Sequence, residues 1–215
     1  MKLNKYIDHT ILKPQATAAD VTKLCREADQ NAFFSVCVNP HFVALASELL
    51  ANSTVAVCSV IGFPLGANTT QIKAQEAAQA VADGATEIDM VINVGALLSG
   101  DHDFVEADIA AVVKAINGRA ALKVIIETCL LNDDQIVAVC KIAKAAGADF
   151  VKTSTGFSTA GATVEHVALM RKTVGPDMGV KASGGIRDCA KALAMIEAGA
   201  NRLGTSNSLQ IVSAD

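Results

Sequence analysis

Short apolar or β-branched segments alternate along the chain with alanine-rich segments whose apolar residues recur at about i, i+3, i+4 and i+7. The first pattern predicts buried strands and the second predicts helices with one buried face. Eight strands are expected, at 6–12, 33–38, 55–63, 87–93, 122–128, 150–154, 179–184 and 202–206. Seven helical segments lie between them, at 16–31, 41–50, 70–84, 103–117, 132–147, 163–175 and 188–199.

This strict alternation is typical of a parallel sheet covered by helices. Eight repeats favour a closed (β/α)8 TIM barrel of the α/β class, although 215 residues is short for that fold. An open doubly wound sheet is the alternative, but it normally carries a glycine-rich loop after its first strand, and segment 7–17 has no glycine. We expect a single barrel domain over residues 1–215, with only a short C-terminal segment after strand eight.

Composition excludes several classes of protein. The chain is 51% hydrophobic with a net charge of −4, which opposes disorder. No Lys/Arg-rich run occurs, and the chain has no Trp and one Tyr, so nucleic acid is not an expected partner. No apolar stretch approaches the roughly 20 residues of a membrane span, so no membrane partner is expected either. Six cysteines without a CxxC pair, and no signal-peptide pattern, predict reduced thiols and a cytoplasmic location.

Charged residues inside the apolar strand patterns are the most informative feature: Asp89, Lys123, Glu127, Lys152 and Lys181. Alternation turns the apolar neighbours of Lys152 and Lys181 outward, so both amines should point into the barrel from adjacent strands. Their repulsion and partial desolvation favour loss of one proton, and a neutral lysine forms Schiff bases with carbonyl compounds. Asp89 could then pair with the remaining ammonium and move protons. The alternative for each charge is a structural salt bridge or a solvent-facing strand end.

Two glycine-containing loops, SGGI at 183–186 and GTSN at 204–207, each precede a helical segment. Glycine lets the backbone approach an anion, and the loops after strands seven and eight are the usual phosphate site of this fold. A tight turn is the alternative for either loop alone. The four histidines lack metal-ligand spacing, so no metal ion is expected.

Two further positions have two interpretations each. Cys37 is either a small packed hydrophobe or a thiol that lines the cavity. Asp8 and Thr10 are expected at the end of the first strand, where barrel enzymes place functional groups, and the alternative is that they cap a turn.

Eight segments, in order along nearly the whole chain, resemble deoxyribose-phosphate aldolases: YIDHTILKP, SVCVNP, SVIGFPLG, EIDMVINVG, LKVIIET, FVKTSTGFS, VKASGGIR and RLGTS. The resemblance implies a class I aldolase that reversibly cleaves 2-deoxy-D-ribose 5-phosphate to D-glyceraldehyde 3-phosphate and acetaldehyde. It implies no added cofactor. Because relatives are often dimers, it also implies a homodimer as a candidate assembly.

The resemblance also implies roles for individual residues. Lys152 is similar to the Schiff-base lysine, Lys181 to the cationic neighbour that favours its neutral form, and Asp89 to the proton-transfer carboxylate. The implied substrate-binding residues are Gly156, Gly184, Gly185 and Ser206 for the phosphate, Asp8 and Thr153 near the sugar hydroxyls, and Cys37 in the pocket wall.

The chain departs from the family pattern at two places. Some relatives have a C-terminal tyrosine that relays a proton, whereas this sequence ends IVSAD and its one tyrosine is Tyr6. Either water acts with Asp89 and Lys181, or the chain is truncated. Asn207 stands where a small hydroxyl residue or glycine is expected. Three alternatives to the implied function are another Schiff-base barrel aldolase or transaldolase, a non-catalytic phosphosugar-binding barrel, and a phosphosugar isomerase or synthase that uses acid/base chemistry.

Overall fold

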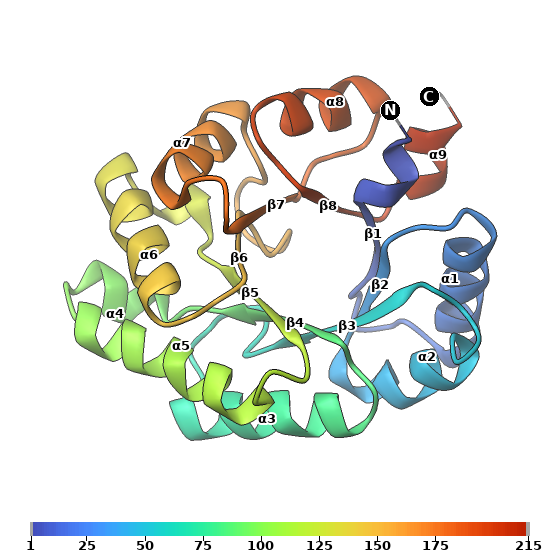
Figure 1. Ribbon diagram of the computed structural model, residues 1–215, viewed down its shortest axis with the longest axis horizontal. Helices are drawn as coiled ribbons and strands as arrows, with labels where there is room; N and C mark the ends of the chain where they lie inside the picture. The colour runs from blue at the N-terminus through green and yellow to red at the C-terminus, as the bar shows by residue number, and fades with distance from the viewer. Residues whose placement is uncertain (1, 214–215) are drawn as a thin grey trace.

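The computed structural model describes residues 2–213, in which eight parallel strands form a closed barrel with β1 paired to both β2 and β8 (Figure 1). The strands are β1 (Ile7–Ile11), β2 (Ser35–Val38), β3 (Ala56–Ile61), β4 (Glu87–Val91), β5 (Ala121–Ile125), β6 (Phe150–Lys152), β7 (Gly179–Ser183) and β8 (Arg202–Thr205). The predicted (β/α)8 architecture is therefore confirmed. Two residues of the divergent C-terminal tail, at 214 and 215, lie outside the described part of the chain.

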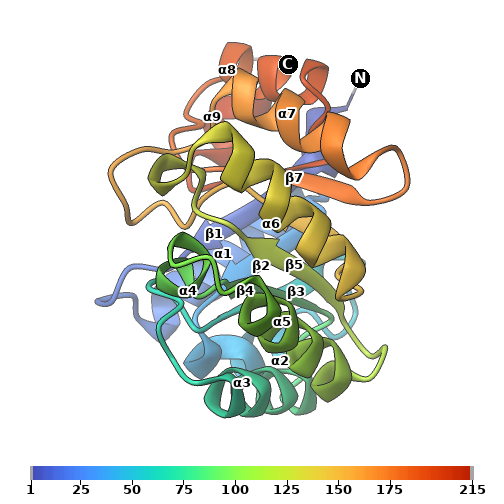
Figure 2. The same cartoon turned by 90° about the vertical axis from the view of Figure 1, so that its left-hand side faces the viewer.

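Helices form a ring outside the strands, and Figure 2 shows α4, α5 and α6 on the outer side of β4 and β5. They are α1 (Ala18–Gln30), α2 (Val43–Leu49), α3 (Thr70–Ala82), α4 (Val94–Leu98), α5 (His102–Ile116), α6 (Asp133–Ala145), α7 (Val164–Val174), α8 (Cys189–Glu197) and α9 (Ser208–Val212). Three 3-10 helices add to them: η1 (Leu3–Tyr6), η2 (Pro40–Phe42) and η3 (Thr128–Leu130). The sequence pattern did not predict α4 or the 3-10 helices, because each is too short to show a helical period.

Side-chain alternation along the strands divides the apolar residues into two clusters. Outward residues such as Ile88, Leu122 and Val180 pack with the helices in one large cluster between strands and helices. A second, small cluster lies inside the barrel and contains Leu12, Cys37, Cys58 and Val60, with Phe63 packed against it. The remaining inward positions are largely polar or charged, so most of the chain's apolar burial lies outside the strand ring.

Seven of the eight strands end one to three residues earlier than predicted, and for two of them a left-handed residue follows the end. The strand expected at 55–63 ends at Ile61 because Gly62 takes φ +57°, and the strand expected at 122–128 ends at Ile125, two residues before Glu127 with φ +54°. Such left-handed backbone cannot continue a strand. Glu127 therefore lies beyond the end of β5, in the loop layer above the barrel.

The two ends of the described chain meet on one side of the barrel. The 3-10 helix η1 packs against α9, and Figure 1 shows both elements next to β1 and β8. The short segment after β8 thus forms α9, as its length predicted. No helix of residues 2–213 is long and apolar enough to cross a membrane.

Candidate active site

A cluster of buried charges fills the polar part of the barrel interior, with Asp89 of β4 at its centre. Asp89 Oδ2 accepts hydrogen bonds from Lys152 Nζ at 2.8 Å and from Lys181 Nζ at 2.7 Å. Asp89 Oδ1 accepts from Lys123 Nζ at 2.9 Å. The three predicted catalytic residues are thus in direct contact, and a third lysine completes the group.

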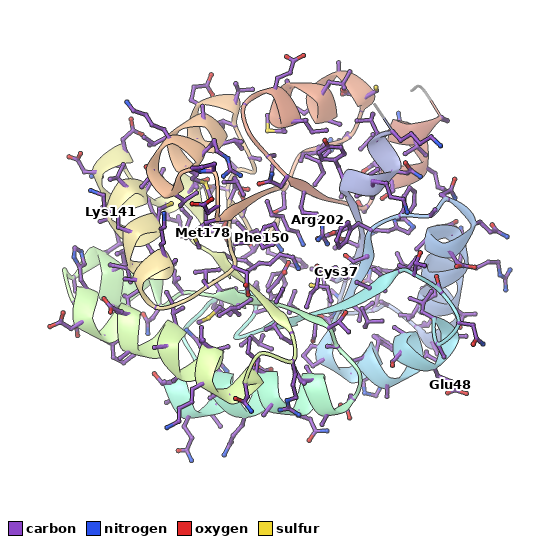
Figure 3. The ribbon with its side chains drawn as sticks, viewed as in Figure 1. Cys37, Glu48, Lys141, Phe150, Met178 and Arg202 are labelled. Carbon is purple, nitrogen blue, oxygen red and sulfur yellow. The ribbon has the colours of Figure 1, made fainter. Side chains whose placement is uncertain are left out.

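Further ion pairs extend this cluster across the barrel. Lys181 Nζ lies 2.5 Å from Asp8 Oδ2, and Lys123 Nζ lies 2.8 Å from Glu87 Oε2. Arg202 of β8 joins the two carboxylates, because its guanidinium donates to Asp8 Oδ1 and to both Glu87 oxygens. Figure 3 shows Arg202 and Cys37 inside the ring of strands, whereas Glu48 and Lys141 extend outward from the helices.

These ion pairs keep the Asp89 carboxylate and two of the lysines charged. Burial by itself would raise the pKa of Asp89, but the charges of Lys123, Lys152 and Lys181 outweigh it and hold the pKa well below its usual range. Burial likewise lowers the pKa of Lys181, yet the carboxylates of Asp8 and Asp89 raise it above that of a free lysine. For Lys123 too, burial lowers the pKa, and Asp89 and the other negative groups raise it overall. The expected repulsion between Lys152 and Lys181 is therefore offset by the carboxylate that bridges them, and Lys181 stays cationic.

A cavity of about 520 Å³ opens at the carboxyl ends of β1, β6, β7 and β8, and Lys152 lies in its wall. Four of the predicted substrate-binding residues also line it: Gly156, Gly184, Gly185 and Ser206. All three glycines have φ between +75° and +85°, which side-chain-bearing residues rarely adopt. A Cβ atom at Gly156 or Gly185 would meet nothing within 4 Å, so the space beside their backbones is open to a ligand.

The loops after β6 and β7 are packed against each other at the edge of this cavity. A Cβ atom at Gly161 would lie 2.1 Å from the carbonyl oxygen of Gly184, so only glycine permits this approach. Ser183 Oγ donates to Ser154 O at 2.5 Å, and Ser183 N donates to Thr153 Oγ1 at 3.0 Å. Thr153 is therefore a buried connection between the two strands and does not line the cavity.

Asp8 and Cys37, two other predicted substrate-binding residues, are also fully buried and do not line the cavity. The pKa of Asp8 falls below its usual range, because the charges of Lys181 and Arg202 outweigh the opposing effect of burial. Cys37 belongs to the small apolar cluster, and its partner in register on β3 is Cys58. Its position fits the interpretation as a small packed hydrophobe: Cys37 faces the barrel interior but does not line the cavity.

Cys37, Cys58 and Asp89 present one ligand atom each within 4.8 Å of one another, a possible arrangement for a metal ion. However, three ammonium groups already surround the Asp89 carboxylate. A further cation there would meet their repulsion in a buried, weakly screened environment. The donor set therefore fits a metal ion poorly.

Three functional features were not predicted as parts of the site. Glu87 lies two residues before Asp89 on β4, and Arg202 lies two residues before Gly204 on β8. Because side chains alternate along a strand, both residues point inward, and this alternation in the sequence could have identified them. Glu127 was noticed only as a charge in a strand. Its carboxylate accepts from Thr155 N at 3.1 Å and from Thr155 Oγ1 at 2.5 Å, and so holds the β6–α7 loop at the cavity.

Comparison with known proteins agrees with this geometry. The model of the DeoC/LacD family aldolases matches residues 2–213. The chain is 63% identical over 213 residues to the deoxyribose-phosphate aldolase of Enterococcus faecalis, covering 99% of this chain and 97% of that protein. It is 62% identical to the enzyme of the same name from Brevibacillus brevis, covering 99% and 96%.

Solved structures show the same likeness. The aldolase QR15 superposes with a TM-score of 0.96 at 43% identity, covering all of this chain and 96% of that one. The tetrameric deoxyribose phosphate aldolase of Aeropyrum pernix superposes with a TM-score of 0.92 at 38% identity, covering 99% and 90%. Because the family model and these relatives span almost every residue that builds the barrel and its cavity, the chain belongs to the DeoC/LacD family of aldolases.

Proposed function

We propose that this chain reversibly cleaves 2-deoxy-D-ribose 5-phosphate to D-glyceraldehyde 3-phosphate and acetaldehyde through a Schiff base on Lys152. The observation that carries the proposal is the position of Lys152 Nζ. It belongs to the buried charge cluster, 2.8 Å from Asp89 Oδ2, and yet Lys152 also lines the cavity. Relatives that are more than 60% identical over nearly the whole chain are named for this activity.

The charge balance of the cluster supports a neutral amine. Four cations, Lys123, Lys152, Lys181 and Arg202, are joined by ion pairs to three carboxylates, Asp8, Glu87 and Asp89. An excess positive charge in a dry interior is costly, and release of one proton removes it. Lys152 is the member of the cluster that can pass a proton to the cavity and receive a substrate there.

The chemistry follows from a neutral Lys152. Its amine adds to the C1 aldehyde of the open-chain sugar, and loss of water leaves an iminium ion. The C2–C3 bond then breaks, because only that bond can deliver its electrons to the iminium as the C3 hydroxyl loses its proton. C3–C4 cleavage would leave the electrons one carbon too far from the iminium. Glyceraldehyde 3-phosphate departs, the remaining enamine takes a proton at C2, and water releases acetaldehyde and the free amine.

Lys181 and Asp89 provide the proton path in this proposal. Asp89 Oδ2 lies between Lys152 Nζ and Lys181 Nζ, at 2.8 and 2.7 Å, so protons can pass between the two nitrogens through one oxygen. Asp8 and Thr153 act by holding Lys181 and Ser183, since neither lines the cavity, and Cys37 packs in the small apolar cluster inside the barrel.

The phosphate is proposed to bind to Gly184 and Gly185 after β7, to Ser206 after β8 and to Gly156 after β6. These residues line one end of the cavity, and their backbone N–H groups and the Ser206 hydroxyl are suitable donors to phosphate oxygens. Asn207 lines the same end, and a phosphate held by backbone donors does not depend on its side chain.

Borohydride trapping tests the proposal. The protein is incubated with acetaldehyde, reduced with borohydride and analysed by peptide mass spectrometry. We expect an ethyl adduct on Lys152, no turnover by Lys152→Leu, and normal trapping in the control Lys141→Leu, whose lysine is exposed on α6. A folded protein without any adduct would instead favour a phosphosugar-binding barrel or an acid/base enzyme.

The homodimer and the cytoplasmic location remain predictions. A relative, the Aeropyrum pernix enzyme, is described as a tetramer, so self-association occurs in this family. Light scattering after size-exclusion chromatography determines the assembly state, and cell fractionation determines the location.

A further inference from the structure

His9 of β1 lies next to the buried charge cluster but is not part of it. Alternation points Asp8 inward and turns His9 toward the helices, where its Nε2 lies 3.0 Å from Glu27 Oε2 of α1. Its Nδ1 lies 2.8 Å from Oγ of Ser208, the first residue of α9. The ring is almost fully buried and packs against Phe33, with 5.3 Å between ring centroids. His9 thus links α1, β1 and α9, which Figure 1 shows on one side of the barrel.

Ser208 ends the loop that carries the proposed phosphate donor Ser206. Thr205 fixes the other end of this β8–α9 loop. Its Oγ1 donates to Ile186 O at 2.7 Å and accepts from Asn207 N at 2.9 Å. Thr205 and Ile186 connect the two phosphate loops to each other. Ser208 and His9 connect the β8–α9 loop to α1, so the position of Ser206 depends on the contacts at both ends of this loop.

We propose that His9, oriented by Glu27, is a positioning residue that holds the β8–α9 loop through Ser208 and so sets the affinity of the cavity for the substrate phosphate. This inference rests on the proposed function, because it assigns the phosphate to that loop.

The direction of each hydrogen bond follows from the chemistry of the groups. An ionised carboxylate only accepts, so His9 Nε2–H donates to Glu27. Nδ1 of the neutral ring then accepts, and the Ser208 hydroxyl donates to it. Burial lowers the pKa of His9, although Glu27 opposes this shift, and the neutral ring is therefore the form at neutral pH. In that form the Ser208 hydrogen is committed to His9, although Thr205 O also lies 3.3 Å from its Oγ.

A role in positioning explains these contacts better than a direct role in the reaction. His9 and Glu27 both line the cavity, but both ring nitrogens of His9 are engaged within the protein, so neither is free to bind substrate. No hydrogen bond joins His9 to Lys152 or Asp89 among the contacts of the described residues. Loss of the link should therefore weaken phosphate binding and leave the carbon chemistry unchanged.

The test compares Ser208→Ala, Glu27→Ala and Glu27→Gln with the wild type and with His102→Asn, a control at an exposed histidine on α5. For each, kcat and KM are measured with 2-deoxyribose 5-phosphate and with unphosphorylated 2-deoxyribose. The Kd of inorganic phosphate is measured by calorimetry.

Ser208→Ala and Glu27→Ala should raise KM for the phosphorylated sugar and the phosphate Kd roughly fivefold to tenfold, the worth of one buried hydrogen bond. The kcat values and the KM for 2-deoxyribose should stay within about twofold of the wild type, because the Schiff-base residues are untouched. Glu27→Gln should behave like the wild type, because its amide oxygen can still accept from His9 Nε2.

Several outcomes overturn the inference: equal losses with both sugars, an unchanged phosphate Kd in Ser208→Ala, or a wild-type protein that binds no phosphate. If the wild type binds phosphate but does not cleave 2-deoxyribose 5-phosphate, the proposed function fails while the Kd series still decides the inference. If Ser208→Ala does not fold, the Glu27→Ala and Glu27→Gln pair decides it, because Glu27 is only partly buried.

Discussion

Replacing Asp89 with asparagine should cost the protein stability as well as activity. The substitution keeps the shape of the side chain but removes the negative charge that three lysine amines contact at 2.7, 2.8 and 2.9 Å. At such distances one ion pair has a Coulomb energy of about 6 kcal/mol at an effective dielectric constant of ~20, before the cost of desolvation. With Lys152 neutral, the three remaining cations would then face two carboxylates. We expect a loss of about 3–5 kcal/mol at pH 7, a large part of the 5–15 kcal/mol typical of a folded domain.

The loss should shrink as the pH rises. Without Asp89, the folded-state pKa values of Lys123 and Lys181 fall below the free-lysine value of about 10.4, because burial is less well compensated. The unfolded chain then binds more protons than the folded chain, so the stability of the variant increases with pH up to that value. In the wild type the pKa values of both lysines are raised, and their contribution is fully present below about 10.4 and lost only at higher pH.

Urea unfolding followed by circular dichroism, at pH 7.0 and pH 9.5 with a thiol reductant, measures both effects. Asp177→Asn, an exposed aspartate before β7, serves as the control for the same change of side chain. The reasoning is refuted if Asp89→Asn lies within about 1 kcal/mol of the wild type at pH 7, or if its deficit is the same at both pH values.

Three further predictions concern the surroundings of the site. Gly204→Ala should reduce turnover and lower the Tm, because its Cβ would lie 3.1 Å from Lys181 Cε, and overpacking typically costs about 1–3 kcal/mol; unchanged kinetics would show that Lys181 can move aside. Glu127→Ala should lower kcat/KM about tenfold by releasing Thr155, with the change mostly in KM, measured by steady-state kinetics. Because the pKa of His9 is lowered in the folded state, unfolding takes up a proton, and the Tm should fall as the pH drops below about 6.5. His9→Asn should show a weaker fall in a calorimetric pH series.

The sequence by itself determined the repeating architecture and the direction of the key side chains. Strand and helix periods are local properties, so eight alternating repeats already predict the barrel. The period of two along each strand also places Lys152 and Lys181 inside, and their register on β6 and β7 confirms that they are side by side. The glycines of the two loops predicted to bind phosphate could also be identified from the sequence, since a left-handed backbone strongly favours glycine.

Only the tertiary structure decided which charges meet. Asp89 is 63 residues from Lys152 and 92 from Lys181, and Asp8 is 194 residues from Arg202, so no local pattern pairs them. Closure of the barrel brings these strands together. As a result, Asp8 is the second residue of β1 and not at its end, lies 2.5 Å from Lys181 Nζ without lining the cavity, and helps to keep Lys181 a cation. The left-handed backbone of Glu127 and the contact of His9 with α9 depend on the same closure, because each joins elements that are adjacent only in the folded ring.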